Sequence, residues 1–130
     1  MIVIDSSALV AILRDEPERR PFLDAIVDHG EPRMSAATYV EASMVMELRR
    51  GDRAGREVDI FMEEVGITIE PVDEAQARIA REAFRRFGKG HHRAALNFGD
   101  CFVYALAKTL DAPVLFKGND FAATDLKRAL

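Results

Sequence analysis

Short apolar segments alternate with longer amphipathic ones along this chain, and this alternation restricts the folds that it can adopt. Residues 2–4, 67–69 and 114–116 each predict a short strand, and residues 32–35 are a weaker candidate. Strands that are joined through helices predict a mostly parallel sheet with helices on both faces. We therefore expect one α/β domain over residues 1–130, a length that suffices for a single core.

Helical periodicity fills the intervals between these strands. Apolar residues recur three or four positions apart, and Gly30 and Gly51 follow the ends of two such segments. The predicted helices cover residues 8–13, 17–28, 36–50, 53–65, 73–87 and 98–109, with a loop over residues 88–96.

Composition excludes several classes of protein. With 48% hydrophobic and 31% charged residues, the chain is typical of folded globular proteins rather than disordered ones. Its longest apolar run, residues 101–107, is far shorter than the roughly 18 residues that a membrane-spanning helix needs. The N-terminus has no basic segment and reaches Asp5 after a short apolar run, unlike a signal peptide. We expect a cytoplasmic protein without membrane contact, in which the single Cys101 is a buried, inert thiol.

Asp5 directly follows the first predicted strand. This position places its carboxylate at the carboxyl edge of the sheet, where open α/β sheets form their sites. A helix-capping aspartate explains the same position equally well. Ser6 or Ser7, however, can provide that cap and leave Asp5 free for a ligand.

Glu41 lies inside a helix rather than after a strand. At 100° per residue it falls within an apolar stripe, which we expect to face the core. A carboxylate on that side is unfavourable unless it is paired or binds a cation. A buried salt bridge to an arginine is the structural alternative. The stripe consists of Ala37, Val40, Met44 and Leu48.

Two further acids occupy comparable positions. Asp100 opens the last long helix, where the helix dipole favours an aspartate regardless of function. Asn97 is already placed to cap that helix, and Gly99 leaves room for a ligand to approach, so the functional interpretation of Asp100 is favoured. Asp120 follows the last strand, where it either joins the site or caps a short terminal helix.

The combination of these acids is more informative than any one of them. Several carboxylates at one sheet edge repel each other, and Mg²⁺ or Mn²⁺ relieves that repulsion with oxygen ligands. Such an ion activates water and stabilises charge on a phosphoryl group. The sequence therefore predicts a metal-dependent phosphodiesterase site around Asp5, Glu41 and Asp100, to which Asp120 is a provisional addition.

Basic residues are concentrated between positions 78 and 93, although the net charge of the chain is −4. If a nucleic acid approaches the acids, Arg85, Arg86, Lys89 and Arg93 are the expected phosphate contacts. A solvated helix face without a ligand explains the same charges. His91 and His92 lack a cysteine partner at zinc spacing, so we do not expect them to bind a metal.

Four sequence segments, in this order and at these separations, resemble a known family. They are IVIDSSALVAIL, SAATYVEASMV, NFGDCFVYALAK and VLFKGNDF. Together they resemble a PIN domain, specifically the VapC-type toxin ribonucleases of bacterial toxin-antitoxin pairs. The resemblance covers nearly the whole chain and implies a Rossmann-like parallel sheet flanked by helices.

The resemblance also implies an activity and a set of site residues. It implies an endoribonuclease that binds Mg²⁺ or Mn²⁺ and cleaves RNA with metal-activated water. It further implies a VapB-type antitoxin partner and a homodimer. The family's four acids fall on Asp5, Glu41, Asp100 and Asp120, while Ser7 and Asn119 fall on pocket-lining positions.

Three other interpretations fit parts of the pattern. A phosphoacceptor receiver domain needs adjacent acids after the first strand, where this chain has Ser6 and Ser7 behind Asp5. A haloacid-dehalogenase-type phosphatase needs a second aspartate at position 7. A PIN-like module that binds RNA or a partner without cutting is the third alternative, and the retained acids argue against it.

Overall fold

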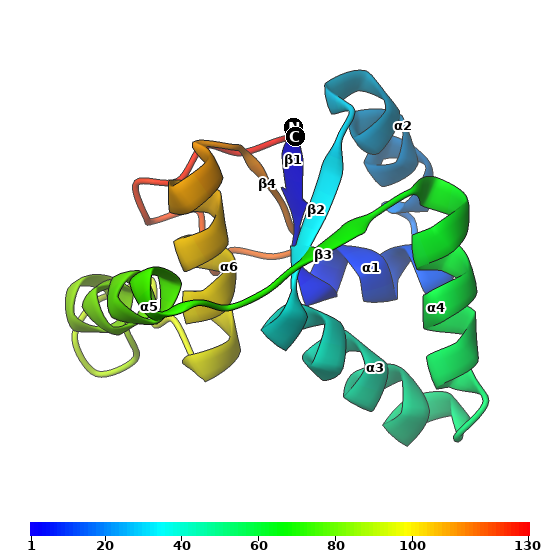
Figure 1. Ribbon diagram of the computed structural model, residues 1–130, viewed down its shortest axis with the longest axis horizontal. Helices are drawn as coiled ribbons and strands as arrows, with labels where there is room; N and C mark the ends of the chain where they lie inside the picture. Colours follow the sequence, from blue (N-terminus) through cyan, green and yellow to red (C-terminus); the bar gives the residue numbers. More distant parts are fainter.

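Four parallel strands form the centre of the molecule in the computed structural model, which describes residues 1–130 (Figure 1). Their order is β3-β2-β1-β4, so β1 lies between β2 and β4. All four predicted strands are confirmed, including the weak candidate at β2. The strands are β1 (Ile2–Ile4), β2 (Pro32–Ser35), β3 (Thr68–Glu70) and β4 (Val114–Leu115).

Six helices lie between these strands along the chain. The predicted helices are confirmed with boundaries that shift by at most two residues. The short terminal helix considered for Asp120 is absent, because the chain after β4 forms turns instead. The helices are α1 (Ser6–Leu13), α2 (Arg19–His29), α3 (Ala36–Arg50), α4 (Ala54–Val65), α5 (Glu74–Phe87) and α6 (Phe98–Leu110).

The helices cover both faces of the sheet, as Figure 1 shows. One face is covered by α1 to α4 and the other by α5 and α6. Successive residues of β1 alternate between them: Ile2 and Ile4 pack in the first core and Val3 in the second, and all three are fully buried. This explains why β1 is apolar throughout, as expected for a parallel strand between two layers.

The topology brings four chain segments to one edge of the sheet. Asp5 follows β1, and its backbone N–H donates to the carbonyl of Leu115 at the end of β4 (3.0 Å). Helix α3 begins directly after β2 at Ala36, and it contacts α6. The residues after β1, the first turns of α3 and α6, and the turn after β4 therefore surround the same place.

The predicted orientation of α3 is wrong. Val40, Met44 and Leu48 of the apolar stripe are exposed by 54%, 57% and 86%. The residues that α3 buries are instead Thr38, Ala42 and Met46. Helix α3 packs on α1 and α4, and the row that fits against these helices is buried rather than the most apolar row.

No helix of this structure is long and apolar enough to cross a lipid bilayer.

Candidate active site

Asp5 is buried at the carboxyl end of β1, where it caps α1. Its Oδ2 accepts hydrogen bonds from the backbone N–H of Ser7 (3.1 Å) and from the Ser7 hydroxyl. The expectation that Ser6 or Ser7 caps this helix is therefore wrong. Asp5 has the extended backbone of a capping residue because it directly follows the strand, and it is the residue whose side chain reaches the free N–H.

The second oxygen of Asp5 has no partner. Its Oδ1 is buried and accepts no hydrogen bond. Burial raises the pKa of Asp5 to about 6; the hydrogen bonds from Ser7 oppose this shift and the charge of Glu41 adds to it. A buried carboxylate oxygen without a donor is unfavourable, and a hard cation is the ligand that would satisfy it. The helix cap therefore uses one oxygen of this side chain and leaves the other open to a ligand.

Two serine hydroxyls hold the acids in place. The Ser6 hydroxyl donates to Oε1 of Glu41 (2.8 Å), which links the start of α1 to α3. The Ser7 hydroxyl donates to Asp5 and accepts from the backbone N–H of Lys117 (2.9 Å), which links α1 to the segment after β4. The sequence predicted Ser6 only as a helix cap and gave no role to Lys117. Lys117 contributes through its backbone N–H, which any residue except proline provides, so no sequence signal could have identified it.

Glu41 is half-buried and points toward the start of α6. A Cβ atom at Gly99 would overlap its Oε2, so its carboxylate fills the space that a side chain would take there. The expectation that Gly99 leaves room for a ligand is therefore wrong, because Glu41 occupies that room. No arginine pairs with Glu41, which removes the salt-bridge alternative.

Asp100 is buried in the first turn of α6. As predicted, the Asn97 side chain caps this helix by accepting from the backbone N–H of Asp100 (2.9 Å), and Oδ2 of Asp100 accepts from the backbone N–H of Asn97 in return (3.0 Å). Burial raises the pKa of Asp100 to about 7; the bond from Asn97 opposes this, and the charges of Asp5, Asp120 and Glu41 add to it. The four predicted acids thus act on one another electrostatically.

Asp120 and Asn119 lie in the turn after β4, and both are exposed. Neither forms a hydrogen bond through its side chain or an ion pair, although the charge of Asp120 reaches Asp100. In this conformation no three acidic, histidine or cysteine side chains are gathered closely enough to hold one metal ion. The buried members of the site are therefore Asp5 and Asp100, and Asp120 stands at its rim.

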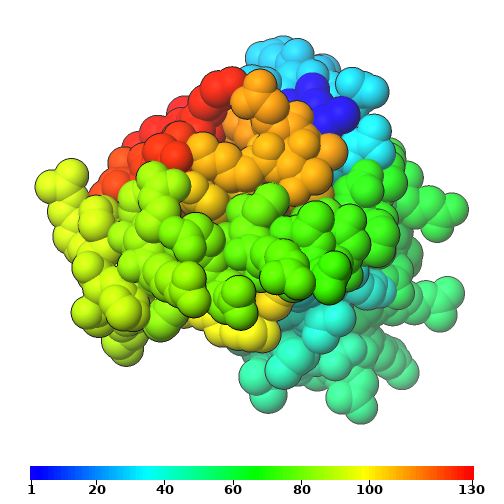
Figure 2. Space-filling view, turned by 60° about the vertical axis from the view of Figure 1, so that its left-hand side comes forward, coloured from blue at the N-terminus to red at the C-terminus, as the bar shows by residue number.

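The predicted phosphate contacts lie on and after α5, which crosses the outside of the molecule in Figure 2. Arg85 pairs with Glu82 (3.6 Å), and Arg86 pairs with Asp125 (3.8 Å). Lys89 and the last of the four residues, Arg93, are exposed in the loop and form no ion pair. The two loop cations are therefore the ones that remain free for a ligand.

Comparison with known protein families gives a match along nearly the whole chain. The family model for the PIN domain matches residues 2–127. A protein named ribonuclease VapC from Mycolicibacterium smegmatis is 50% identical over 125 residues, which cover 96% of this chain and 97% of the relative. Ribonuclease VapC30 from Mycobacterium tuberculosis is 47% identical over 125 residues, which cover 96% and 95%.

Solved structures with the same fold come from toxins and toxin-antitoxin pairs. Mycobacterium tuberculosis VapC20, described as a sarcin-ricin loop cleaving toxin, superposes with a TM-score of 0.77 at 16% identity and covers 97% of this chain and 96% of its own. VapBC2 from Rickettsia felis, bound to a DNA fragment from its promoter, gives 0.76 at 13% identity, with 98% and 96% covered. At these identities the likeness concerns the fold.

Proposed function

This chain belongs to the PIN-domain family, and on that basis we propose that it is a VapC-type endoribonuclease that depends on Mg²⁺ or Mn²⁺ and is the toxin of a toxin-antitoxin pair. The observation that carries the proposal is the unpartnered buried Oδ1 of Asp5, beside Asp100. A fold retains such an arrangement where a ligand satisfies the oxygen.

The donor set fits a hard divalent cation. Asp5 and Asp100 would hold the ion, because each uses one oxygen in a helix cap and has its other oxygen free of hydrogen bonds. Glu41 and Asp120 would complete the site from α3 and from the turn after β4. A bound ion supplies a more acidic water and stabilises negative charge on the phosphoryl oxygens.

The residues around these acids control their geometry and their protons. Ser7 fixes Asp5, and Ser6 with Gly99 fixes Glu41 between α1 and α6. With its pKa raised to about 7, Asp100 holds a proton for about half of the time at neutral pH when no cation is near. A cation therefore displaces protons when it binds, and affinity for it rises with pH.

We further propose an RNA substrate, a VapB-type antitoxin and a homodimer in the cytoplasm. The names of the similar proteins support the first two. Exposed Val40, Met44 and Leu48 on α3 offer apolar surface that a protein partner would cover. An antitoxin arginine that enters the acidic pocket would inhibit the toxin, because it replaces the charge of the cation.

Cleavage of RNA with and without metal tests this proposal. We expect cleavage in Mg²⁺ or Mn²⁺ that EDTA stops and that Asp5→Asn or Asp100→Asn abolishes while the fold survives. Asp28→Asn, an exposed acid on α2, is the matched control and should cleave normally. Equal activity in EDTA would contradict metal dependence, and binding without cleavage in either metal would favour the non-cutting module.

A further inference from the structure

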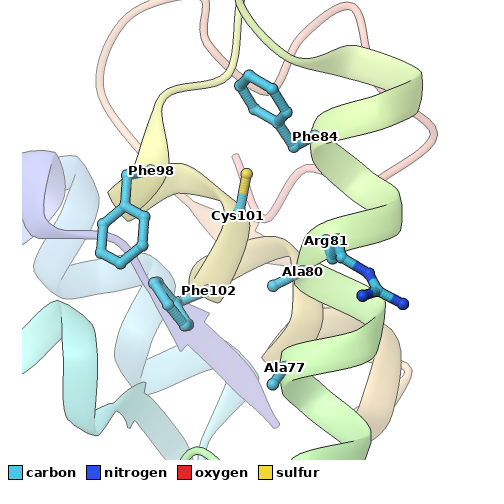
Figure 3. Close-up of a pocket in the computed structure, with 7 residues that line it drawn as sticks. All are labelled: Ala77, Ala80, Arg81, Phe84, Phe98, Cys101 and Phe102. Atoms are coloured by element: carbon cyan, nitrogen blue, oxygen red, sulfur yellow. The ribbon is translucent and has the colours of Figure 1, made fainter.

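An apolar groove lies between α5 and α6, and its lining includes Phe98, the residue before the Gly99 that Glu41 contacts. Its volume is about 410 Å³. Figure 3 shows side chains of α5 facing side chains of α6 across it, with Cys101 at its floor. The facing residues are Ala77, Ala80 and Phe84 on α5, and Phe98 and Phe102 on α6.

Phe98 is the most exposed aromatic residue of this groove. It is 79% exposed although it immediately precedes Gly99 and Asp100 of the acidic site. The edge of one ring packs on the face of the other between Phe98 and Phe102, with ring centroids 4.8 Å apart and an interplanar angle of 77°. That contact holds the Phe98 ring in place while most of its surface faces solvent, which makes it a platform for a flat partner.

Positive charge borders the groove on its α5 side. The stem of Arg81 lines it, and Figure 3 shows the guanidinium turned away from Phe98 and Phe102; Arg81 is exposed and forms no ion pair. At one end, the ring of His91 packs edge-on against Phe84 (5.2 Å), which brings the basic loop of residues 88–96 to the groove. A ligand with apolar flat faces and an anionic backbone matches both the lining and the border.

Single-stranded RNA has this chemistry, since its bases stack on aromatic rings and its phosphates pair with arginine. The acids of the site repel phosphates, whereas stacking on Phe98 is not opposed by that repulsion. We propose that the groove binds an unpaired base beside the cleaved phosphodiester, stacked on Phe98, with Arg81 contacting a neighbouring phosphate. This inference rests on the proposed ribonuclease function and gives it a single-stranded substrate.

Binding to two probes separates stacking from phosphate contact. One is a fluorescein-labelled single-stranded RNA of twelve mixed nucleotides, and the other is an abasic ribose-phosphate chain of equal length, both measured by anisotropy in EDTA. Phe98→Ala should raise the Kd for the RNA about tenfold and leave the Kd for the abasic chain unchanged, and Phe98→Trp should retain affinity. Arg81→Gln should weaken binding of both probes.

Val27→Ala is the matched control, because Val27 on α2 is also 79% exposed but lies outside the groove. It should bind both probes like the wild type. In Mn²⁺, Phe98→Ala should raise KM for RNA cleavage about tenfold with little change in kcat, since the stacked base is not the reacting group.

Several results would contradict the proposal that this groove binds a base. They are an unchanged Kd of Phe98→Ala for RNA, an equal loss on both probes, or a dimer that Phe98→Ala dissociates in sedimentation while RNA binding is kept. The last result would assign the groove to a second copy of the chain. If the wild type cleaves RNA and Phe98→Ala has the same KM, only this inference fails; if the wild type neither binds nor cleaves RNA, the proposed function fails with it.

Discussion

The two carboxylate oxygens of Asp5 have different surroundings. Oδ2 caps α1 through Ser7, while Oδ1 is buried without a donor. From the sequence, a capping role and a ligand-binding role for Asp5 were alternatives, because a position directly after a strand is compatible with either. Which oxygen points where depends on the strand-to-helix turn, and no residue pattern encodes that. The acids themselves were predictable; the division of labour within Asp5 was not.

Asp100 should make the metal-free protein less stable as pH rises. Its pKa in the folded state is raised from 3.8 to about 7, so the folded state binds more protons than the unfolded state between these values. The free energy of unfolding then falls as pH rises through this window. In EDTA at pH 8 we expect Asp100→Asn to be more stable than the wild type by up to about 4 kcal/mol, and by less where solvent screens the carboxylate, with the difference vanishing near pH 4.

Urea unfolding of both proteins at several pH values measures this difference. Mn²⁺ at pH 8 should raise the melting temperature of the wild type more than that of Asp100→Asn. A wild type that is more stable than the variant in EDTA at pH 8 would contradict the raised pKa.

Gly99→Ala should separate stability from activity. The added methyl group overlaps the Glu41 carboxylate and must displace it, while alanine favours a helix by up to about 1 kcal/mol over glycine. We expect metal-dependent RNA cleavage to fall at least tenfold and Mn²⁺ affinity to fall, with the free energy of unfolding unchanged or higher. Cleavage rates and Mn²⁺ titration calorimetry are the measurements.

Gly55→Ala is the matched control, because it creates the same kind of overlap with a glutamate outside the site. A Cβ atom at Gly55 of α4 would overlap Oε1 of Glu47, an exposed carboxylate on α3 outside the site. Glu47 can swing into solvent, so cleavage should be unaffected. Equal loss of activity in both variants would mean that Gly99 acts through helix geometry rather than through Glu41.

At the scale of elements, α3 shows where periodicity fails. Its length was predicted correctly, because Gly51 and the repeat of apolar residues mark its ends. Its orientation was not, because the most apolar row, with Val40 and Met44, faces outward. Hydropathy reports which residues are apolar, but the side of α3 that packs is chosen by shape, and Ala42 and Met46 are the α3 residues in the core shared with α1. Glu41 sits in the site although the argument that placed it there was wrong.

A cluster around Asp125 joins α5, α6 and the C-terminal segment. The carboxylate of Asp125 accepts from the hydroxyl of Tyr104 (2.8 Å) and pairs with Lys108 (2.8 Å) and Arg86 (3.8 Å). Tyr104 is buried, so loss of Asp125 leaves its hydroxyl hydrogen without an acceptor, although Arg86 still donates to the hydroxyl oxygen (3.5 Å). Arg86 is therefore part of the fold as well as of the basic segment.

Asp125→Ala should lower the free energy of unfolding by about 1–2 kcal/mol, because one change removes a hydrogen bond and two ion pairs. Urea denaturation measures the loss. Asp24→Ala is the control, since Asp24 of α2 is 63% exposed at its side chain and pairs only with Arg20 (3.6 Å); it should cost less than about 0.5 kcal/mol. Similar losses for the two variants would show that the Asp125 cluster is a surface feature.

At the scale of the whole molecule, the parallel sheet and the position of the acids at one edge of it followed from the sequence, because short apolar strands admit few topologies. The groove beside the site did not. It requires Phe98 to stay exposed next to a buried acid, and apolar character alone predicts burial for phenylalanine. The one sequence signal for the exposure of Phe98 was its position as the first residue of α6, before the apolar run that begins at Cys101.

Opposite charges are separated in this molecule. The acids lie at one edge of the sheet and the basic residues in the loop of residues 88–96, although the net charge of the chain is −4. Because Lys89 and Arg93 have no ion pairs, they should contribute more to RNA binding than Arg85 and Arg86, which already have acidic partners. Replacing both loop cations by glutamine should reduce the slope of log Kd against log salt by about 1.4, at about 0.7 per phosphate contact of a single strand. The Arg85→Gln and Arg86→Gln pair should change it less.

The matched control is Arg49→Gln with Arg53→Gln, which also removes two positive charges, one near the end of α3 and one at the start of α4. Both arginines are exposed and form no ion pair. If this control flattens the salt dependence as much as the loop variant does, net charge governs binding and the loop is a solvated surface. A slope that changes only in the loop variant places the phosphate backbone against residues 88–96, which lead directly into the helix that carries Asp100.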